Sequence, residues 1–405
     1  MINYDDEDYI AAREALIDGD LDTTRSILKR MLAGNPDSLE ATELCGDLAH
    51  AMGDFNKAER LYLKLAKLSD DPLTQATSQL SRGILASELR QHDQAKALLG
   101  AAAEAFGEMG VVNQQALALG NLGTACLDAC DLLKAEDVLL QAIDCYTECE
   151  DFDAVALVCA DLACAYRMMG RLQQAEEMFH RAMDMFETLG EQIHVASCLD
   201  GLGIIHQVRS EYEQAETMHQ AAVAINQSLD CEEGLSVNYG NLAILCQHQS
   251  NFSKAIEYLE LAYQLDREAG REDGEADYLA NLGDIKREQG ELDEAESLLL
   301  RAIKCEKEFG DAEGLACTYQ KLSLVYREQN RLEECEKLTE RVIKMVDEIG
   351  QVDALAGALN EFGVLRQRQG RAQEAAELWQ RSLCIYEQLE SKRMIEEVKK
   401  QLESL

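Results

Sequence analysis

The sequence comprises 405 residues and has a formal net charge of −38, because 76 acidic side chains outnumber 38 basic ones. A chain of this length exceeds one ordinary compact core, which leaves either several domains or a repeat array. The negative charge repels nucleic acid phosphates and anionic lipid surfaces, so we expect no nucleic acid and no membrane among the partners, while basic or apolar protein segments remain possible.

Helix is the expected secondary structure along the whole chain. Only two prolines occur, Pro36 and Pro72, whereas Ala, Leu, Glu and Gln are abundant. Proline interrupts helices and the other four residues favour them. The composition therefore predicts an all-α protein without long irregular linkers.

The first segment, residues 1–74, is predicted to hold repeats of short period. Gly19 and Gly53 are 34 residues apart, and each opens a Gly-Asp-hydrophobic tripeptide. Residues 5–8 are all acidic, where a secretory signal peptide would need positive charge. Since the chain also lacks a run of about eighteen apolar residues, we expect a cytoplasmic protein.

Residues 75–390 are predicted to form repeats with a period of forty residues. A small residue recurs at this interval, and a second one follows most of them after seven positions. Seven residues make about two helical turns, so both lie on one face of one helix. The first register is Ala95, Ala135, Ala175, Ala215, Ala255, Ala295, Cys335 and Ala375, and the second is Ala102, Ala142, Ala182, Ala222, Ala262 and Ala302.

A second helix is predicted upstream in each repeat, marked by a large residue followed by a small one. The large side chain fills the core, and the small one lets the partner helix approach closely. The pairs are Leu122-Gly123, Leu162-Ala163, Leu202-Gly203, Leu242-Ala243, Leu282-Gly283, Leu322-Ser323 and Phe362-Gly363.

Turn-forming residues separate the predicted helices. Glycine at a helix C-terminus adopts the left-handed conformation at little steric cost, and these positions fit that role. Within repeats they are Gly170, Ser210, Ser250, Gly290, Asn330 and Gly370, and between repeats they are Gly110, Gly190, Gly270, Gly310 and Gly350.

These registers resemble the tetratricopeptide repeat superfamily over essentially the whole chain. The match is close at Asn121-Leu122-Gly123 and Asn281-Leu282-Gly283, each followed by the two alanines of the second helix. The forty-residue period is similar to the longer-repeat branch found in kinesin light chains, spindle-orientation adaptors and many bacterial regulators. The resemblance implies a right-handed superhelical solenoid of about ten helix-turn-helix repeats, with residues 391–405 as a C-terminal capping helix.

No group of residues in the sequence points to catalysis. There is no glycine-rich phosphate loop, no HExxH and no CxxC, so we expect neither an enzyme nor a cofactor. Cys126 with Cys130 and Cys145 with Cys149 are each four apart on predicted helices, but a pair of thiolates lacks the other ligands of a closed zinc site. We interpret the fourteen scattered cysteines as reduced, largely buried thiols, in keeping with a cytoplasmic protein.

The resemblance implies that a ligand binds along a concave wall formed by the first helix of each repeat. Counting the small residue after the large one as position 8, the ligand positions are 2, 5, 6, 9, 12 and 13. In the two middle repeats only Asp200 is charged among these positions, and uncharged Ile, Val and amide side chains fill the rest. Such a stretch in an acidic protein is typical of an interaction site, although the same residues could simply pack within the superhelix.

The predicted peptide-binding residues combine this stretch with asparagines at position 6 and basic residues on either side. An asparagine amide can pair with the main chain of an extended peptide. A lysine at position 5, which chaperone-tail binders of this superfamily use, is absent. The predicted set is Asn121, Arg167, Ile204, Gln207, Val208, Val237, Asn241, Ile244, Gln247, Asn281, Arg287 and Arg327.

Three functional hypotheses follow from the sequence. The leading one is an adaptor or scaffold whose groove binds an extended or helical segment of another protein. The second is a scaffold that assembles with copies of itself into a homo-oligomer. The third is a regulatory sensor that changes superhelical pitch when it binds a small peptide, as implied by the bacterial relatives.

Overall fold

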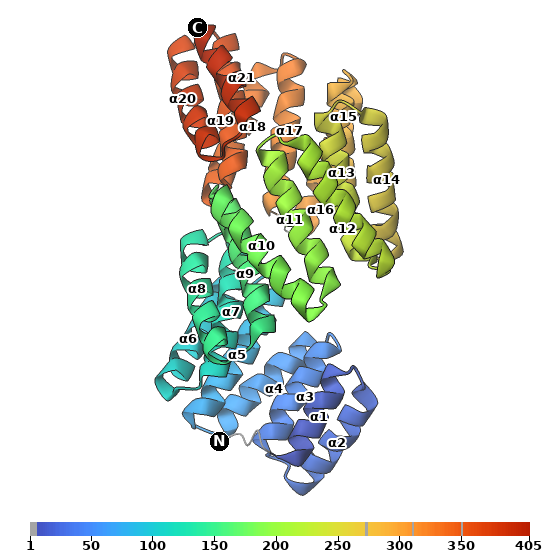
Figure 1. Ribbon diagram of the computed structural model, residues 1–405, viewed down its shortest axis with the longest axis vertical. Helices are drawn as coiled ribbons and strands as arrows, with labels where there is room; N and C mark the ends of the chain where they lie inside the picture. The colour runs from blue at the N-terminus through green and yellow to red at the C-terminus, as the bar shows by residue number, and fades with distance from the viewer. Residues whose placement is uncertain (1–5, 272–273, 310–311, 350) are drawn as a thin grey trace. The chain divides into compact units, whose positions relative to one another are not determined.

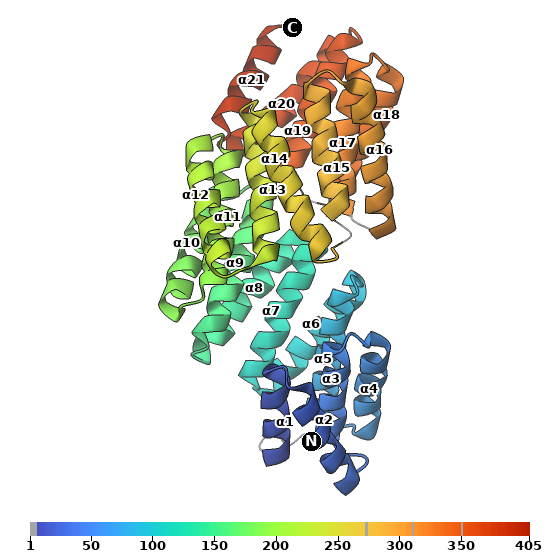
Figure 2. The same ribbon diagram turned by 90° about the vertical axis from the view of Figure 1, so that its right-hand side faces the viewer.

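The computed structural model describes residues 6–271, 274–309, 312–349 and 351–405. These residues form 21 α-helices and contain no strand, which confirms the all-α prediction. The chain divides into two compact units, Met1–Asp161 and Leu162–Leu405. Figures 1 and 2 show the helices of each unit stacked side by side in chain order. None of the described helices is long and apolar enough to cross a membrane.

The helices of the first unit pair as α1 with α2, α3 with α4, α5 with α6 and α7 with α8. Their bounds are α1 Glu7–Ile17, α2 Leu21–Gly34, α3 Leu39–Ala51, α4 Phe55–Leu68, α5 Pro72–Glu88, α6 His92–Met109, α7 Val112–Asp128 and α8 Leu132–Glu148. Helix α9, Phe152–Met168, begins in this unit and ends in the next.

The second unit continues the same hairpin pairing from α11 with α12 to α19 with α20, and α21 packs against α20. The bounds are α10 Leu172–Leu189, α11 Gln192–Val208, α12 Tyr212–Ser228, α13 Glu232–His248, α14 Phe252–Glu268, α15 Gly274–Glu288, α16 Leu292–Phe309, α17 Ala312–Glu328, α18 Leu332–Ile349, α19 Val352–Arg368, α20 Ala372–Gln388 and α21 Lys392–Glu403. This arrangement is the predicted helical repeat solenoid.

The large-then-small pairs have the predicted packing role. A Cβ atom added to Gly283 would lie 2.9 Å from Leu299 Cγ, and one added to Gly203 would lie 2.6 Å from His219 Cε1. The alanines of the second helices are almost all fully buried. Close approach of the two helices in these repeats therefore depends on a glycine, which has no side chain, at the second position of the pair, as the sequence indicated.

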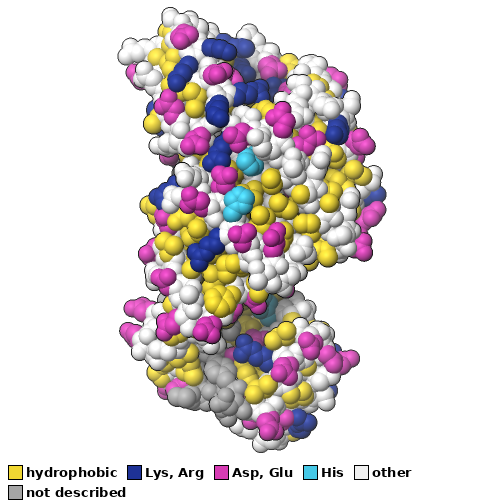
Figure 3. Space-filling model, viewed as in Figure 1, with side chains coloured by type: hydrophobic (Ala, Val, Ile, Leu, Met, Phe, Trp, Pro, Cys, Tyr) yellow, Lys and Arg dark blue, Asp and Glu magenta, His cyan; other side chains and the backbone are white. Residues whose placement is uncertain are grey.

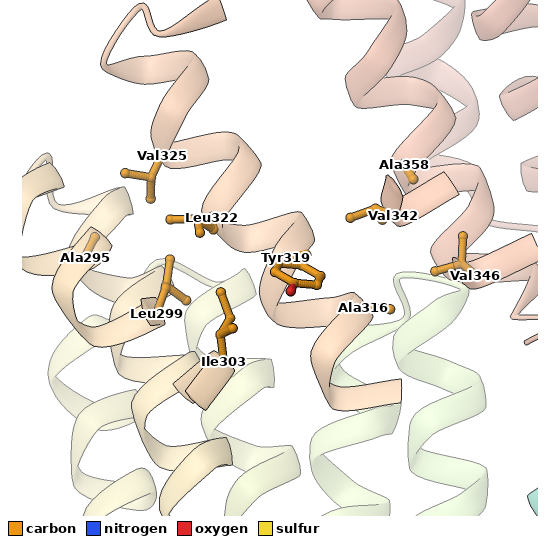
Figure 4. Packing of buried hydrophobic residues seen from close by; sticks show 10 residues of the cluster. All are labelled: Ala295, Leu299, Ile303, Ala316, Tyr319, Leu322, Val325, Val342, Val346 and Ala358. Carbon is orange, nitrogen blue, oxygen red and sulfur yellow. The ribbon is translucent and has the colours of Figure 1, made fainter. Parts of the chain in front are cut away.

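The core runs from one repeat into the next. Figure 4 shows side chains from α16, α17, α18 and α19 that meet in a single cluster. Tyr319 and Leu322 of α17 lie between Leu299 of the preceding helix and Val342 of the following one. A repeat hides its apolar surface against its neighbours, so the array needs no separate central core.

The turns follow the predicted forty-residue rhythm. Nine predicted turn residues have positive φ, namely Gly110, Gly170, Gly190, Ser210, Ser250, Gly270, Gly290, Asn330 and Gly370. Gly310 and Gly350 lie outside the described residues. Seven further positions with positive φ were not among the predicted turn residues. Two are the glycines Gly19 and Gly53, and five carry other residues, which adopt this conformation less readily than glycine: Arg90, Cys130, Glu150, Asp230 and Glu390.

The C-terminal helix makes a contact that sequence reasoning did not predict. Val398 of α21 is fully buried, as expected for a capping helix. Arg393 Nη1 also donates a hydrogen bond of 2.9 Å to the Tyr212 hydroxyl, and Glu390 Oε2 lies 3.5 Å from Arg209 Nε. The end of the second unit therefore touches the α11–α12 turn, which is far earlier in the sequence.

Candidate functional site

A cavity of about 420 Å³ lies between α13, α14 and α15 in the second unit. Figure 3 shows hydrophobic side chains gathered over the neighbouring helices α11–α14. Four predicted site residues, Val237, Asn241, Ile244 and Asn281, line this cavity. The other lining residues are Glu233, Ser236, Gly240, Leu259, Ala262, Tyr263, Asp266, Arg271, Gly274, Asp277 and Tyr278.

The shape of the cavity depends on Gly240, which occupies the interior of α13. A Cβ atom at this position would meet no atom within 4 Å. Gly240 therefore differs from Gly203 and Gly283, where side chains of a neighbouring helix occupy the space beside the glycine. Glycine weakens a helix interior. At this position it allows no closer packing of a neighbouring helix and leaves open space instead.

Aromatic and apolar side chains form the floor and one wall of the cavity. Leu259 and Ala262 of α14 are buried beneath it. The rings of Tyr263 and Tyr278 stack with their centroids 4.7 Å apart, and the pair joins α14 to α15. Burial raises the pKa of the Tyr278 hydroxyl, with the negative charge of Glu260 as the next cause.

The rim carries three carboxylates and one guanidinium. Arg271 donates from Nε and Nη2 to Asp266 Oδ1, at 2.9 and 2.7 Å. A Cβ atom on Gly274 would lie 2.6 Å from the Asp266 Cβ, so glycine is needed for this carboxylate to reach its place. With Glu233 and Asp277 added, the lining has a formal charge of −2.

A buried polar network lies beside the cavity, around Asp200. Its Oδ1 lies 2.7 Å from His219 Nδ1 and accepts a hydrogen bond of 3.0 Å from Asn238 Nδ2. Its Oδ2 accepts a hydrogen bond of 2.7 Å from Asn241 Nδ2. The single charged residue of the predicted uncharged stretch is therefore an internal anchor for the Asn241 side chain.

Each predicted groove asparagine already uses one end of its amide within the protein. Asn121 Nδ2 donates to the Leu117 carbonyl at 2.8 Å, in the first unit. Asn281 Oδ1 accepts from Lys321 Nζ at 2.6 Å. Asn241 thus keeps an acceptor and Asn281 keeps a donor for another molecule, and neither presents a complete amide.

Three other predicted residues belong to a network of ion pairs and hydrogen bonds on the odd-numbered helices. Gln247 Nε2 donates to Asp284 Oδ2 at 2.7 Å, and Arg287 pairs with Asp284 and with Glu328. Burial opposes ionisation of Asp284, but these contacts and the charge of Lys321 hold its pKa below the ordinary value. Arg327 likewise pairs with Glu361.

The remaining predicted residues lie outside the cavity. Ile204, Gln207 and Val208 of α11 are half-buried, as is Arg167 near the end of α9. Val237 is the most accessible apolar residue of the predicted stretch, with 55% of its surface exposed.

Sequence reasoning missed the contribution of α14. Leu259, Ala262, Tyr263 and Asp266 line the cavity from the second helix of a repeat, whereas the expected ligand positions all lie on first helices. The open space at Gly240 was also unpredictable, because its surroundings depend on how far α15 stands from α13. The tyrosines on either side of the α14–α15 turn were the available signal.

Comparison with known proteins gives a consistent picture of the fold. Models described as tetratricopeptide repeat match residues 15–77, 152–228, 234–308 and 355–392. No curated protein sequence matches the chain.

Several solved structures share the fold at low sequence identity. The apo form of the quorum sensor NprR from B. thuringiensis is 15% identical, with 84% of this chain and 97% of that chain covered and a TM-score of 0.66. Aspartyl phosphate phosphatase F from Bacillus subtilis is 12% identical, covering 84% and 93%, with a TM-score of 0.61. A Rap protein complexed with competence and sporulation factor is 13% identical, covering 94% and 97%, with a TM-score of 0.51.

Proposed function

Since the chain belongs to the tetratricopeptide repeat family, we propose that it is a protein-interaction scaffold that holds a peptide segment of a partner along α11, α13 and α15. The observation that carries this proposal is the α13–α15 cavity, whose lining includes Val237, Gly240, Asn241 and Ile244 of the uncharged stretch of groove residues. A cavity of this size with an apolar floor and a few polar groups at its rim fits a binding site. A cytoplasmic location belongs to the same proposal.

Similar structures support a binding role. One similar structure is described as a quorum sensor, and another was solved in complex with competence and sporulation factor. The likeness itself concerns the fold, so the role is proposed on the cavity and the exposed Val237.

The sharpest test fills the cavity without disturbing the fold. Gly240→Leu places a Cβ atom where no other atom lies within 4 Å and extends the side chain towards the cavity that Gly240 lines, and leucine favours a helix more than glycine does. We expect unchanged or slightly raised thermal stability, by about 0.5–1 kcal/mol, together with loss of the partners that wild-type protein retains in affinity purification with mass spectrometry.

A matched control separates blocking from a general effect of leucine. Gly100→Leu changes the same residue type in α6, where the nearest atom to a new Cβ is 3.9 Å away. This variant should retain the wild-type partners. A Gly240→Leu protein that is folded and still retains them would refute the groove assignment. The paired change Ile204→Asp and Val237→Asp should also abolish retention, because charged side chains disrupt an apolar contact.

The sensor hypothesis stays as a second candidate because of the contact between α21 and the α11–α12 turn. The hydrogen bond from Arg393 to Tyr212 and the ion pair between Arg209 and Glu390 tie two distant parts of the second unit together. A sensor should change its radius of gyration when it binds a segment, and Arg393→Ala should alter that change. Small-angle scattering with equal radii in free and bound protein would exclude this candidate.

A further inference from the structure

We propose that the α13–α15 cavity is a subsite for an arginine side chain of the bound segment. This inference rests on the proposed function, since it names the chemistry that the groove selects. The subsite would determine specificity through residues outside the predicted ligand positions. These are the tyrosines of the wall, Tyr263 and Tyr278, and two of the three acidic residues of the rim, Glu233 and Asp266.

The charge of the lining selects a cation. The lining holds the carboxylates of Glu233, Asp266 and Asp277 and one guanidinium, that of Arg271, whose Nε and Nη2 both donate to Asp266. An apolar guest would remove water from these carboxylates without replacing its hydrogen bonds, which is costly. A guanidinium would supply several N–H donors to them at once.

The aromatic wall favours arginine over lysine. Tyr263 and Tyr278 both line the cavity, and a planar guanidinium stacks on a tyrosine ring more readily than an ammonium does. The chain uses this pairing elsewhere, since the Arg331 guanidinium carbon lies 4.1 Å from the centroid of the Tyr326 ring. The long aliphatic part of arginine also suits the apolar floor formed by Leu259 and Ala262.

The two asparagines at the cavity fit the main chain that would carry this arginine. Asn241 Nδ2 is held by Asp200, which leaves its carbonyl oxygen as an acceptor. Asn281 Oδ1 is held by Lys321, which leaves its NH₂ group as a donor. One acceptor and one donor match the N–H and C=O groups of an extended peptide, and the side chain between them enters the cavity.

The test begins with a displayed library of random peptides selected on the full-length protein. The peptide that binds most strongly is then synthesised with its basic residue as arginine, lysine or citrulline, which has the shape of arginine without its charge. Affinities are measured by fluorescence anisotropy on wild-type protein, on Glu233→Gln/Asp277→Asn and on Glu257→Gln/Glu268→Gln. The last variant makes the same charge change at exposed residues of α14 that do not line the cavity.

We expect the selected peptides to share an arginine. Replacing it with citrulline should weaken binding to wild-type protein by about tenfold or more, and replacing it with lysine by a smaller factor. The citrulline effect should fall below about threefold in Glu233→Gln/Asp277→Asn and remain in the control variant. Thermal melting should show that both variants are folded.

The opposite results are equally clear. Selected peptides without arginine, a lysine peptide that binds as well as the arginine peptide, or a citrulline effect that survives in Glu233→Gln/Asp277→Asn would each overturn the subsite while leaving peptide binding intact. A library from which no peptide is selected, together with a Gly240→Leu protein that keeps its partners, would overturn the proposed function and the subsite with it.

Discussion

At the scale of single residues, one unusual ionisable group is Glu43 in α3. Glu43 is only 7% exposed, and its Oε2 has no hydrogen-bond partner among the described residues. Burial, followed by the negative charge of Asp47, raises its pKa from 4.5 to about 8. Asp47 itself accepts a hydrogen bond of 2.8 Å from the Tyr62 hydroxyl.

This shift predicts how stability depends on pH. The folded protein keeps the Glu43 proton at pH values where the unfolded chain has lost it, so the free energy of unfolding should fall as pH rises from 4.5 towards 8. Glu43→Gln removes the charge and keeps the shape. We expect it to raise stability at pH 8 by roughly 1–3 kcal/mol and to leave it nearly unchanged at pH 4.5, as measured by denaturant unfolding.

The comparison variant is Glu40→Gln, which removes a carboxylate from the same helix at a half-buried position. Its effect should be small and should not grow between pH 4.5 and pH 8. Equal stabilisation of Glu43→Gln at both pH values would show that Glu43 is ionised in the folded protein.

The spacing of residues in the sequence predicted where small residues allow two helices to approach closely, but not which polar atoms form hydrogen bonds. Gly203 and Gly283 were recognised as close-approach positions because the spacing of a repeat fixes their neighbour. The bond between Asp200 and Asn241 joins α11 to α13, and it depends on rotamers and on the distance between neighbouring repeats. The sequence therefore predicted Asn241 as a groove residue and missed that half of its amide is already used.

At the scale of elements, the sequence predicts some turns of the repeat well and misses others. Glycine occupies eight of the sixteen left-handed positions among the described residues, whereas Cys130 and Glu150 adopt the same conformation without any local signal. We attribute the left-handed conformation of these two residues to the packing of the helices on either side of each turn. Backbone geometry is thus imposed by stacking where the side chain does not favour it.

One turn offers a direct measure of this imposed strain. Ser210 has a φ of 62°, in the left-handed region that glycine adopts more readily. Ser210→Gly should therefore stabilise the protein by about 0.5–1 kcal/mol, after the larger conformational entropy of glycine in the unfolded chain is counted. Thermal melting provides the measurement.

Gly190 provides the reverse control, since its φ of 83° would become a strained position for alanine. Gly190→Ala should destabilise the protein by a similar amount or more. A Ser210→Gly variant that melts below wild type would mean that the serine side chain makes a stabilising contact in the turn.

At the scale of the whole molecule, stability should be local. Each repeat contacts mainly its neighbours, as the cluster shared by α16–α19 shows. The family pattern predicted this architecture because the same registers recur along the chain. It could not predict the contact of α21 with the α11–α12 turn, which depends on the accumulated rotation of many repeats.

Removal of residues 391–405 tests this locality. The surface of α20 that α21 covers would be exposed, so amide hydrogen exchange should speed up in α19 and α20. The α11–α12 turn should also exchange faster, because Arg393 no longer binds Tyr212. Helices α1–α4 should keep their wild-type rates, and a uniform acceleration along the chain would contradict the repeat-by-repeat description.

Gly240 has a consequence for how this sequence can change over generations. The residue weakens its helix and no neighbour requires its small size. Laboratory evolution for heat tolerance alone should therefore replace it early with alanine or something larger. Evolution that also rewards recognition should retain it, so two populations bred under these regimes would diverge at this codon first.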